Sequence, residues 1–208
     1  MRKNVLRLMM TALFIAVAVP FVKAQVQVGD ILCEGNRVVS RSDFQPTDDK
    51  AIGVIFYVDN TQEHGWAVSL QNESSCSWGP YGDDAPLTNC NNRGQASDDL
   101  DGYGNTETIR NLDLEYPAFE AVRFADGWYL PAAGQMKELY ANIKEVDEGL
   151  SAAGGDTFQL NGLTYWTSSE YSDTDAWHIT TIGGLEHSNN SFDDNKGVYR
   201  WVRSVRDF

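Results

Sequence analysis

Apolar residues near the start of the chain recur in patterns that are typical of β-strands. Residues 52–58 form a continuous apolar, β-branched and aromatic run, and residues 66–70 form a second run after the polar, turn-like stretch 60–65. These two runs predict a hairpin. Residues 26–33 alternate more weakly between apolar and polar positions and predict an earlier strand.

Helical spacing replaces the strand pattern in the middle of the chain. A short helix is predicted over residues 117–125. A longer one is predicted over residues 136–146, where apolar side chains recur with the spacing of one helix face. Surface helices normally bury such a stripe, so we interpret it as core packing rather than as a groove for a partner. Glycines 154–155 end this helical region.

Strand patterns return in the last part of the chain. Short strands are predicted at residues 165–167 and 176–182, and the glycine pair 183–184 predicts a tight turn into a strand at residues 185–188. The final strand, residues 198–205, does not keep strict alternation, which indicates a β-bulge.

One long polar segment, residues 71–105, separates the first strands from the helices. It is rich in Asn, Asp, Ser, Gly and Pro. Such a loop in a compact domain is usually functional or held by a cross-link. Strands, a long loop, helices and further strands predict an α+β fold. There is no internal repeat or interdomain linker, so residues 25–208 are expected to form a single domain.

Residues 1–24 have the pattern of a secretory signal peptide. A basic start is followed by the uncharged apolar stretch 8–19, by Pro20, and by small residues that predict cleavage after Ala24. A membrane anchor is the alternative, but this stretch is shorter than the roughly 20 residues of a membrane-spanning helix. No later segment predicts a span. We therefore expect an exported protein in the periplasm, on the cell surface or in the medium.

The charge of the chain limits its partners. The formal net charge is −14, and without residues 1–24 there remain 12 basic and 30 acidic side chains, a charge of −18. Nucleic acids and anionic lipids are bound through Lys and Arg, so neither is expected as the main partner. The one basic cluster in the sequence consists of Lys196, Arg200, Arg203 and Arg206.

Export makes disulfides possible, and the chain has three cysteines. Cys76 and Cys90 flank a loop rich in Gly, Pro, Asp and Asn, which a disulfide between them would close. Cys33 lies in an apolar run and predicts a small buried side chain. A reactive Cys33 is the alternative, without a Cys-His arrangement to support it. The odd number leaves the pairing open.

No motif of a zinc protease or of a serine hydrolase is present in the sequence. We expect no cofactor, with Ca²⁺ as the one candidate ion, because Asp99 and Asp101 place carboxylates at alternate positions next to a glycine. Tyr103 stands where a third carboxylate is needed. The alternative is therefore a polar turn that leads into a helix capped by Asn105 or Thr106.

The region 168–192 interleaves aromatic, hydroxyl, amide and imidazole side chains, a mixture that suits ligand recognition. An ordinary half-exposed sheet edge has a similar composition, so both interpretations stay open. Trp166, Trp177 and Trp201 are expected to pack as supporting core. The expected ligand-binding residues are Tyr171, Asp173, Asp175, His178, Thr180, His187, Asn189 and Phe192.

Several segments together resemble one family of exported bacterial proteins. Residues 127–134 and the helix that follows to Tyr140 resemble its W-x-L-P-[ST]-x-x-E-L element. Residues 165–171 resemble its Y-W-[ST]-S-[ST]-E-Y strand, and residues 176–177 and 199–206 resemble its last two strands. Residues 28–31, 52–58 and 99–106 also look like members of this family. The chain thus resembles the Lcl C-terminal-domain family, which has a C-type lectin-like fold.

This resemblance implies a binding module, often for adhesion or surface display, with paired N- and C-terminal strands and a loop-rich ligand face. Some relatives vary exposed positions where residues 178–196 would fall. The calcium motifs of sugar-binding C-type lectins are missing here, as is the C-terminal Cys pair of formylglycine-generating enzymes. Neither activity is therefore implied. A glycosaminoglycan ligand would fit the family, but the net charge opposes it.

Three functional hypotheses follow from the sequence. The leading one is an exported, non-enzymatic module that binds a glycan or protein ligand of unknown identity. The alternative is a structural or accessory subunit of a bacterial surface assembly, in which the edge strand at residues 26–33 would pair with a partner strand. An enzyme on the same fold ranks last.

Overall fold

The structure, a computed structural model, describes residues 25–158, 163–181, 184–186 and 195–208. Within these residues the chain forms two five-stranded sheets, five α-helices and two short 3-10 helices. The strands are β1 (Ile31–Cys33), β2 (Arg37–Val39), β3 (Ala51–Val58), β4 (Gly65–Ser69), β5 (Ser75–Cys76), β6 (Thr164–Glu170), β7 (Ala176–Thr180), β8 (Gly184–Glu186), β9 (Arg200–Trp201) and β10 (Val205–Asp207). The helices are η1 (Glu34–Asn36), α1 (Arg93–Asp98), α2 (Gly102–Arg110), α3 (Pro117–Glu120), η2 (Phe124–Asp126), α4 (Ala133–Ala141) and α5 (Ile143–Ala153).

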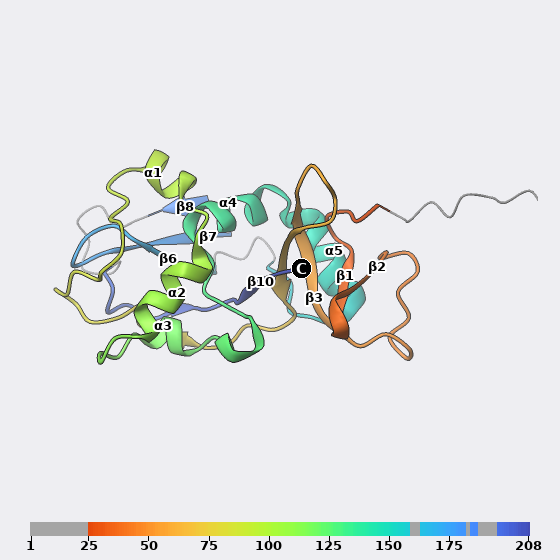
Figure 1. Cartoon of the computed structure of the whole chain (residues 1–208), viewed down its shortest axis with the longest axis horizontal. Coiled ribbons are helices and arrows are strands. Elements are labelled where there is room, and N and C mark those ends of the chain that lie inside the picture. The colour runs from red at the N-terminus through yellow and green to blue at the C-terminus, as the bar shows by residue number, and fades with distance from the viewer. Residues whose placement is uncertain (1–24, 159–162, 182–183, 187–194) are drawn as a thin grey trace, which may run out of the picture.

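Sheet A has the strand order β10-β4-β3-β1-β2 and is antiparallel throughout. Its centre is the predicted hairpin of β3 and β4, in which Tyr57 pairs with Trp66 and Val58 with Gly65. Helix α5 packs on β3 and buries Val146 there. Figure 1 shows sheet A and α5 together in the right-hand half of the molecule.

Sheet B has the strand order β5-β9-β6-β7-β8. All its described pairs are antiparallel except β6 with β9, which run parallel. The predicted hairpin of β7 and β8 is confirmed, whereas its turn at residues 182–183 lies outside the described residues. In Figure 1 this sheet lies in the left-hand half, together with α1, α2 and α3.

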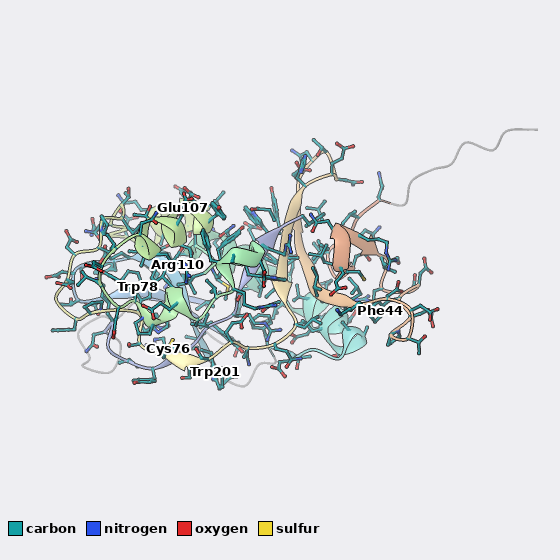
Figure 2. All side chains as sticks on the ribbon, turned by 60° about the horizontal axis from the view of Figure 1, so that its bottom comes forward. Phe44, Cys76, Trp78, Glu107, Arg110 and Trp201 are labelled. Atoms are coloured by element: carbon teal, nitrogen blue, oxygen red, sulfur yellow. The ribbon has the colours of Figure 1, made fainter. Side chains whose placement is uncertain are left out.

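Two large apolar clusters fill the interior. One joins β3 and β4 of sheet A to α4 and α5 and extends to Tyr165 of β6. The other surrounds Trp78 and Trp166, and the ring of Trp78 meets Tyr116 and Phe119 edge-to-face at centroid distances of 5.6 and 5.1 Å. Figure 2 shows Trp78 in the half that also holds α2 and α3. Bulky aromatic side chains therefore form much of the core beside sheet B.

The end of the chain crosses from one sheet to the other. The single strand predicted at residues 198–205 is instead β9 in sheet B and β10 in sheet A. Arg203 lies between them with no exposed surface, and its guanidinium donates to the carbonyl oxygens of Ser69, Leu70 and Asp156 at 2.8–3.0 Å. Burial lowers the pKa of Arg203 to about 10, so it stays charged at neutral pH. The broken alternation marks this crossing rather than a bulge.

The predicted long helix is two helices. The chain leaves helical geometry at Asn142 (φ −112°, ψ 17°), whose side-chain amide donates to the carbonyls of Phe56 and Glu138. Apolar spacing continues across this break because α4 and α5 both pack on sheet A. The helix predicted at residues 117–125 is likewise shorter and ends as α3 at Glu120.

The first strand is shorter than predicted and is not an edge. β1 spans residues 31–33 and pairs with β2 on one side and β3 on the other, so the expectation of a free edge strand at residues 26–33 is wrong. The edges of sheet A are β2 and β10. β1 and β10 share this sheet but do not pair directly.

The segment 71–105, predicted as a loop, contains β5, α1 and the start of α2. It holds no disulfide. Cys33, Cys76 and Cys90 are all free thiols, which corrects the predicted bridge between Cys76 and Cys90. Cys76 pairs opposite Arg200 in sheet B, near Trp201 (Figure 2), whereas Cys90 packs with Ala96 and Trp177. The predicted burial of Cys33 is confirmed.

Candidate functional site

An open polar cleft of about 390 Å³ lies at the loop-rich end of the molecule, near α1 in Figure 1. We name it the Asp99 cleft. Its lining combines hydroxyl and amide groups with carboxylates and one thiol. These side chains belong to Thr88, Asn89, Cys90, Gln95, Asp98, Asp99, Asp101 and Asn105.

Two helix starts give the cleft its shape. Asn92 caps α1 by accepting from the backbone N–H of Gln95 at 3.0 Å, and the Gln95 side chain accepts from the N–H of Asn91 at 2.9 Å. Asp101 caps α2 by accepting from the N–H of Gly104 at 2.8 Å. The cap of α2 is therefore Asp101. The sequence-based prediction of Asn105 or Thr106 as the cap is wrong.

Asp99 ties the cleft to the body of the fold. One carboxylate oxygen accepts from the hydroxyl of Ser169 at 2.6 Å and from the amide of Asn105 at 3.1 Å, and the other accepts from the N–H of Asp101. Its backbone carbonyl accepts from Gly134 at the start of α4. Asp99 therefore connects α1, α2 and β6, and both of its oxygens already have protein partners.

The candidate calcium ligands have these structural roles. Asp99 bonds within the fold and Asp101 caps a helix. Across the described residues, no three His, Cys, Asp or Glu side chains are arranged to hold a metal ion. Calcium binding at Asp99 and Asp101 stays a prediction that a chelator would test.

Cys90 forms part of the cleft wall and is held by its backbone. Its N–H donates to the carbonyl of Glu170 at 2.8 Å, and its carbonyl accepts from the indole of Trp177 at 2.7 Å. Burial, assisted by the charge of Asp99, raises the pKa of the Cys90 thiol to about 11. The thiolate, which is the nucleophilic form, is thus a minor species at neutral pH.

A buried ion pair holds the segment that leads to Cys90. Glu170 and Lys196 pair with no exposed side-chain surface, and the Lys196 ammonium lies 4.8 Å from the Trp78 ring centre. Glu170 also accepts from the N–H of Ala85 at 3.0 Å, and Lys196 donates to the carbonyl of Asp83 at 2.6 Å. The pair therefore fixes the start of segment 83–90, and the backbone carbonyl of Glu170 fixes its end at Cys90. Burial raises the pKa of Glu170.

The turn between β6 and β7 adjoins the cleft and carries three of the predicted ligand residues. Tyr171 is half-buried against Trp177, and its carbonyl accepts from the amide of Asn91 at 2.9 Å. Asp173 is exposed, whereas Asp175 accepts from the hydroxyl of Thr174 at 2.6 Å within the turn. The structure thus holds these three residues in one turn, in which Tyr171 lies beside the Asp99 cleft.

Two of the other predicted ligand residues, His178 and Thr180, do not join this surface. His178 and Thr180 lie in β7 with only 3% and 8% of their surface exposed, so the expectation that they face a ligand in solvent is wrong. His187, Asn189 and Phe192 lie outside the described residues. Trp166 and Trp177 are buried as expected, but Trp201 is only half-buried.

The basic residues that cluster in the sequence do not form an exposed patch. Lys196, Arg200 and Arg203 are exposed by 0%, 6% and 0%, and only Arg206 is half-exposed, near the Trp128 ring. These cations hold the fold together instead of presenting a patch to an anionic polymer. A glycosaminoglycan site at this cluster is therefore excluded by burial.

The sequence interpretation missed Thr88, Asn89, Gln95 and Asn105 as cleft residues. Their segment was treated as a loop, although Asn92 followed three positions later by Gln95 is a helix-start pattern. That signal would have placed α1, and with it one wall of the cleft.

Comparison with known proteins identifies the fold at a coarse level. No protein-family model and no curated protein matches the sequence. Among solved structures, the chain is similar to a fimbrial protein from Bacteroides ovatus ATCC 8483, with a TM-score of 0.67 and 17% identity. The chain therefore shares the fold of part of that protein.

The similarity covers 88% of this chain but 49% of the fimbrial protein, so the chain spans about half of that protein's length. It supports an α+β fold with mainly antiparallel sheets, whereas the Lcl family and the C-type lectin-like fold are not established by it. Within the described part of the chain, no helix has the length and apolar character needed to cross a membrane.

Proposed function

We propose that this chain is a structural or accessory subunit of an exported bacterial surface assembly of the fimbrial kind. The observation that carries the proposal is the fold, which follows a fimbrial protein over 88% of the chain at a TM-score of 0.67. The sequence pattern of residues 1–24, which predicts export, agrees with this role.

The edges of the sheets are the places where such a subunit would meet its neighbours. The expected edge at residues 26–33 is interior, and the outer strand on that side is β2. β2 is three residues long and begins with Arg37, which pairs with Asp49 at 2.5 Å. A short, charged edge resists uncontrolled strand addition. We therefore expect a neighbouring subunit to bind through specific side-chain contacts and not by adding a strand to the β2 edge of sheet A.

Immunogold electron microscopy on the producing bacterium tests this proposal. Antibodies raised against residues 25–208 should label fibres on intact cells, and the chain should co-purify with fibres sheared from them. Cells that lack the gene provide the control. A chain found only as a free monomer in the periplasm or medium would contradict the proposal.

A second candidate function is ligand binding at the Asp99 cleft, which the predicted recognition turn adjoins. Its amide, hydroxyl and carboxylate groups suit a ligand rich in hydroxyl or amide groups. A glycan and matrix-protein array with residues 25–208 would identify such a ligand. Thr88→Val and Asp98→Asn alter exposed lining residues and should weaken binding. Tyr199→Ala changes an exposed residue outside the cleft lining and should leave it unchanged.

A further inference from the structure

A second pocket opens at the end of the β3–β4 hairpin, beside β10. It shares no lining residue with the Asp99 cleft. Its volume is about 300 Å³. We name it the Trp66 pocket. The lining side chains that carry its chemistry are Tyr57, Asp59, His64, Trp66, Asp207 and Phe208.

Aromatic rings form the apolar part of this pocket. Tyr57 and Trp66 pair across the hairpin, and their rings stack with a centroid distance of 4.4 Å and an interplanar angle of 28°. Phe208 follows β10, and its ring lies so close to Gly65 that a Cβ there would come within 2.7 Å of it. Gly65 is therefore required for Phe208 to close this side. All three aromatic side chains are half-buried and keep part of their surface accessible.

Carboxylates form the polar part. Asp59 is held in the hairpin loop by the hydroxyl of Thr61 at 2.7 Å and by the N–H groups of Thr61 and Gln62. These hydrogen bonds, that from the Thr61 hydroxyl foremost, lower the pKa of Asp59 and keep it ionised at neutral pH. Asp207 accepts from the hydroxyl of Tyr129 at 3.2 Å. Both acids are thus positioned by the fold and not by a ligand.

The charge of the pocket decides what it would bind. Among the described residues, the lining contains two carboxylates, the imidazole of His64 and no Lys or Arg. The chain as a whole carries a net charge of −14. Anionic ligands are therefore disfavoured. A neutral sugar would stack on the rings but would gain little from two ionised carboxylates. A cation gains from both, because aromatic faces and carboxylates attract it together.

We propose that the Trp66 pocket binds an arginine or lysine side chain of a partner protein. The stem of such a side chain packs on the rings of Tyr57, Trp66 and Phe208, and its charged end reaches Asp59 and Asp207. The occupant follows from charge complementarity between an acidic, aromatic pocket and a basic side chain. This inference goes beyond the assembly role and does not depend on it, because it is tested with small soluble probes.

The test is an NMR titration that follows the indole N–H of Trp66 in the folded chain, assigned with Trp66→Phe. The probes are Ac-Gly-Arg-Gly-NH₂ and Ac-Gly-Lys-Gly-NH₂, with Ac-Gly-Nle-Gly-NH₂ as the uncharged control and methyl α-glucoside as the neutral sugar. We expect saturable shifts with the Arg and Lys peptides alone. Raising the salt concentration from about 20 mM to about 500 mM should weaken the binding of both peptides, because salt screens the attraction between the carboxylates and the cation.

Variants locate the site. Asp59→Asn combined with Asp207→Asn should weaken the Arg peptide by about tenfold or more, since both charges that attract the cation are lost. Asp207→Asn alone keeps an acceptor for Tyr129 and tests the charge if the double variant does not fold. Glu63→Gln removes the same charge from an exposed position on the same hairpin, outside the described lining, and should change affinity little.

Any one of four results would overturn the inference. They are an equal response to the norleucine peptide, saturation by the glucoside without saturation by the basic peptides, full affinity in the Asp59 and Asp207 variants, and the absence of any shift. None of these results bears on whether the chain is found in surface fibres, so the two proposals fail separately.

Discussion

The half of the molecule built on sheet A and the half built on sheet B differ in what holds their backbone in place. Sheet A is antiparallel throughout and is covered by α5, and apolar side chains such as Val54, Phe56 and Leu150 fill its core. The core beside sheet B is apolar too, but there buried polar side chains also bond directly to the backbone of the loops. The first half is held mainly by apolar burial, whereas the loops of the second depend in addition on individual polar contacts.

Three tryptophans make such bonds beside sheet B, and two of them, Trp78 and Trp177, tie a loop to the sheet. The indole N–H groups of Trp78, Trp166 and Trp177 donate to backbone carbonyls of Thr167, Cys76 and Cys90 at 2.7, 3.0 and 2.7 Å. Each indole supplies apolar area and a hydrogen bond at once. A loop fixed in this way can be polar and irregular and still have a defined shape. The Asp99 cleft is built on such loops.

The largest expected effect comes from breaking the buried pair of Glu170 and Lys196. Lys196→Met leaves the Glu170 carboxylate buried without its partner and should destabilise the protein by about 3–5 kcal/mol in denaturant unfolding. Adding Glu170→Gln should recover part of the loss. Lys137→Met, on an exposed position of α4, is the control and should stay within about 0.5 kcal/mol of wild type. A small effect of Lys196→Met would contradict the role given to the pair.

Truncating a buried apolar side chain beside sheet A should lower the free energy of unfolding by about 3 kcal/mol. Leu150→Ala removes a fully buried side chain of α5 from the core beside sheet A and leaves a cavity. Unlike Lys196→Met, it should leave the Asp99 cleft intact in the folded state. Ser151→Ala, next to it and exposed, is the matched control. If Leu150→Ala altered amide signals at Cys90, the two halves would not be independent.

Removing one indole hydrogen bond should have a smaller effect. Trp177→Phe keeps much of the apolar area but leaves the Cys90 carbonyl unpaired, at a cost of about 1–3 kcal/mol. Calorimetric melting measures the change. The half-buried Trp201 serves as the comparison through Trp201→Phe. Equal losses at both positions would show that the indole bond to Cys90 contributes nothing specific.

Removing the helix cap at the cleft should destabilise the protein less than removing the indole hydrogen bond. Asp101→Ala removes the acceptor for the Gly104 N–H at the start of α2 and should destabilise by about 1 kcal/mol. Asp98→Ala changes an exposed neighbouring acid that caps no helix start and should have less than half that effect. If calcium stabilised the wild-type protein and not Asp101→Ala, Asp101 would be an ion ligand as well as a cap.

The reactivity of the thiols tests whether the cysteines are unbridged and whether the pKa of Cys90 is raised. A titration with a thiol reagent after denaturation without reductant should find three thiols per chain, against one if Cys76 and Cys90 were bridged. In the folded protein, Cys90 should react slowly up to pH 9 and faster only as the pH approaches 11, where its thiol ionises. Because this folded pKa lies above the unfolded one, native stability should fall as the pH rises between them.

Sequence patterns predicted the regular part of the fold better than the site. The β3–β4 hairpin was found from two apolar runs on either side of a polar turn, and the β7–β8 pair from local alternation followed by a glycine pair. The buried pair of Glu170 and Lys196 could not be found in this way. It joins residues 26 positions apart, and each side chain alone is typical of a surface. The burial of His178 was missed for a related reason, since a polar residue in a strand is usually exposed.

Amide hydrogen exchange in the wild-type protein tests most directly whether polar contacts hold the loops beside sheet B. If these contacts hold the loops, exchange should be slow at Ala85 and Cys90, whose N–H groups donate to Glu170, and fast at Thr88, between them. Lys196→Met should then abolish the protection at Ala85. Fast exchange at both Ala85 and Cys90 in the wild-type protein would contradict this role of the polar contacts, because segment 83–90 would then be an ordinary mobile loop.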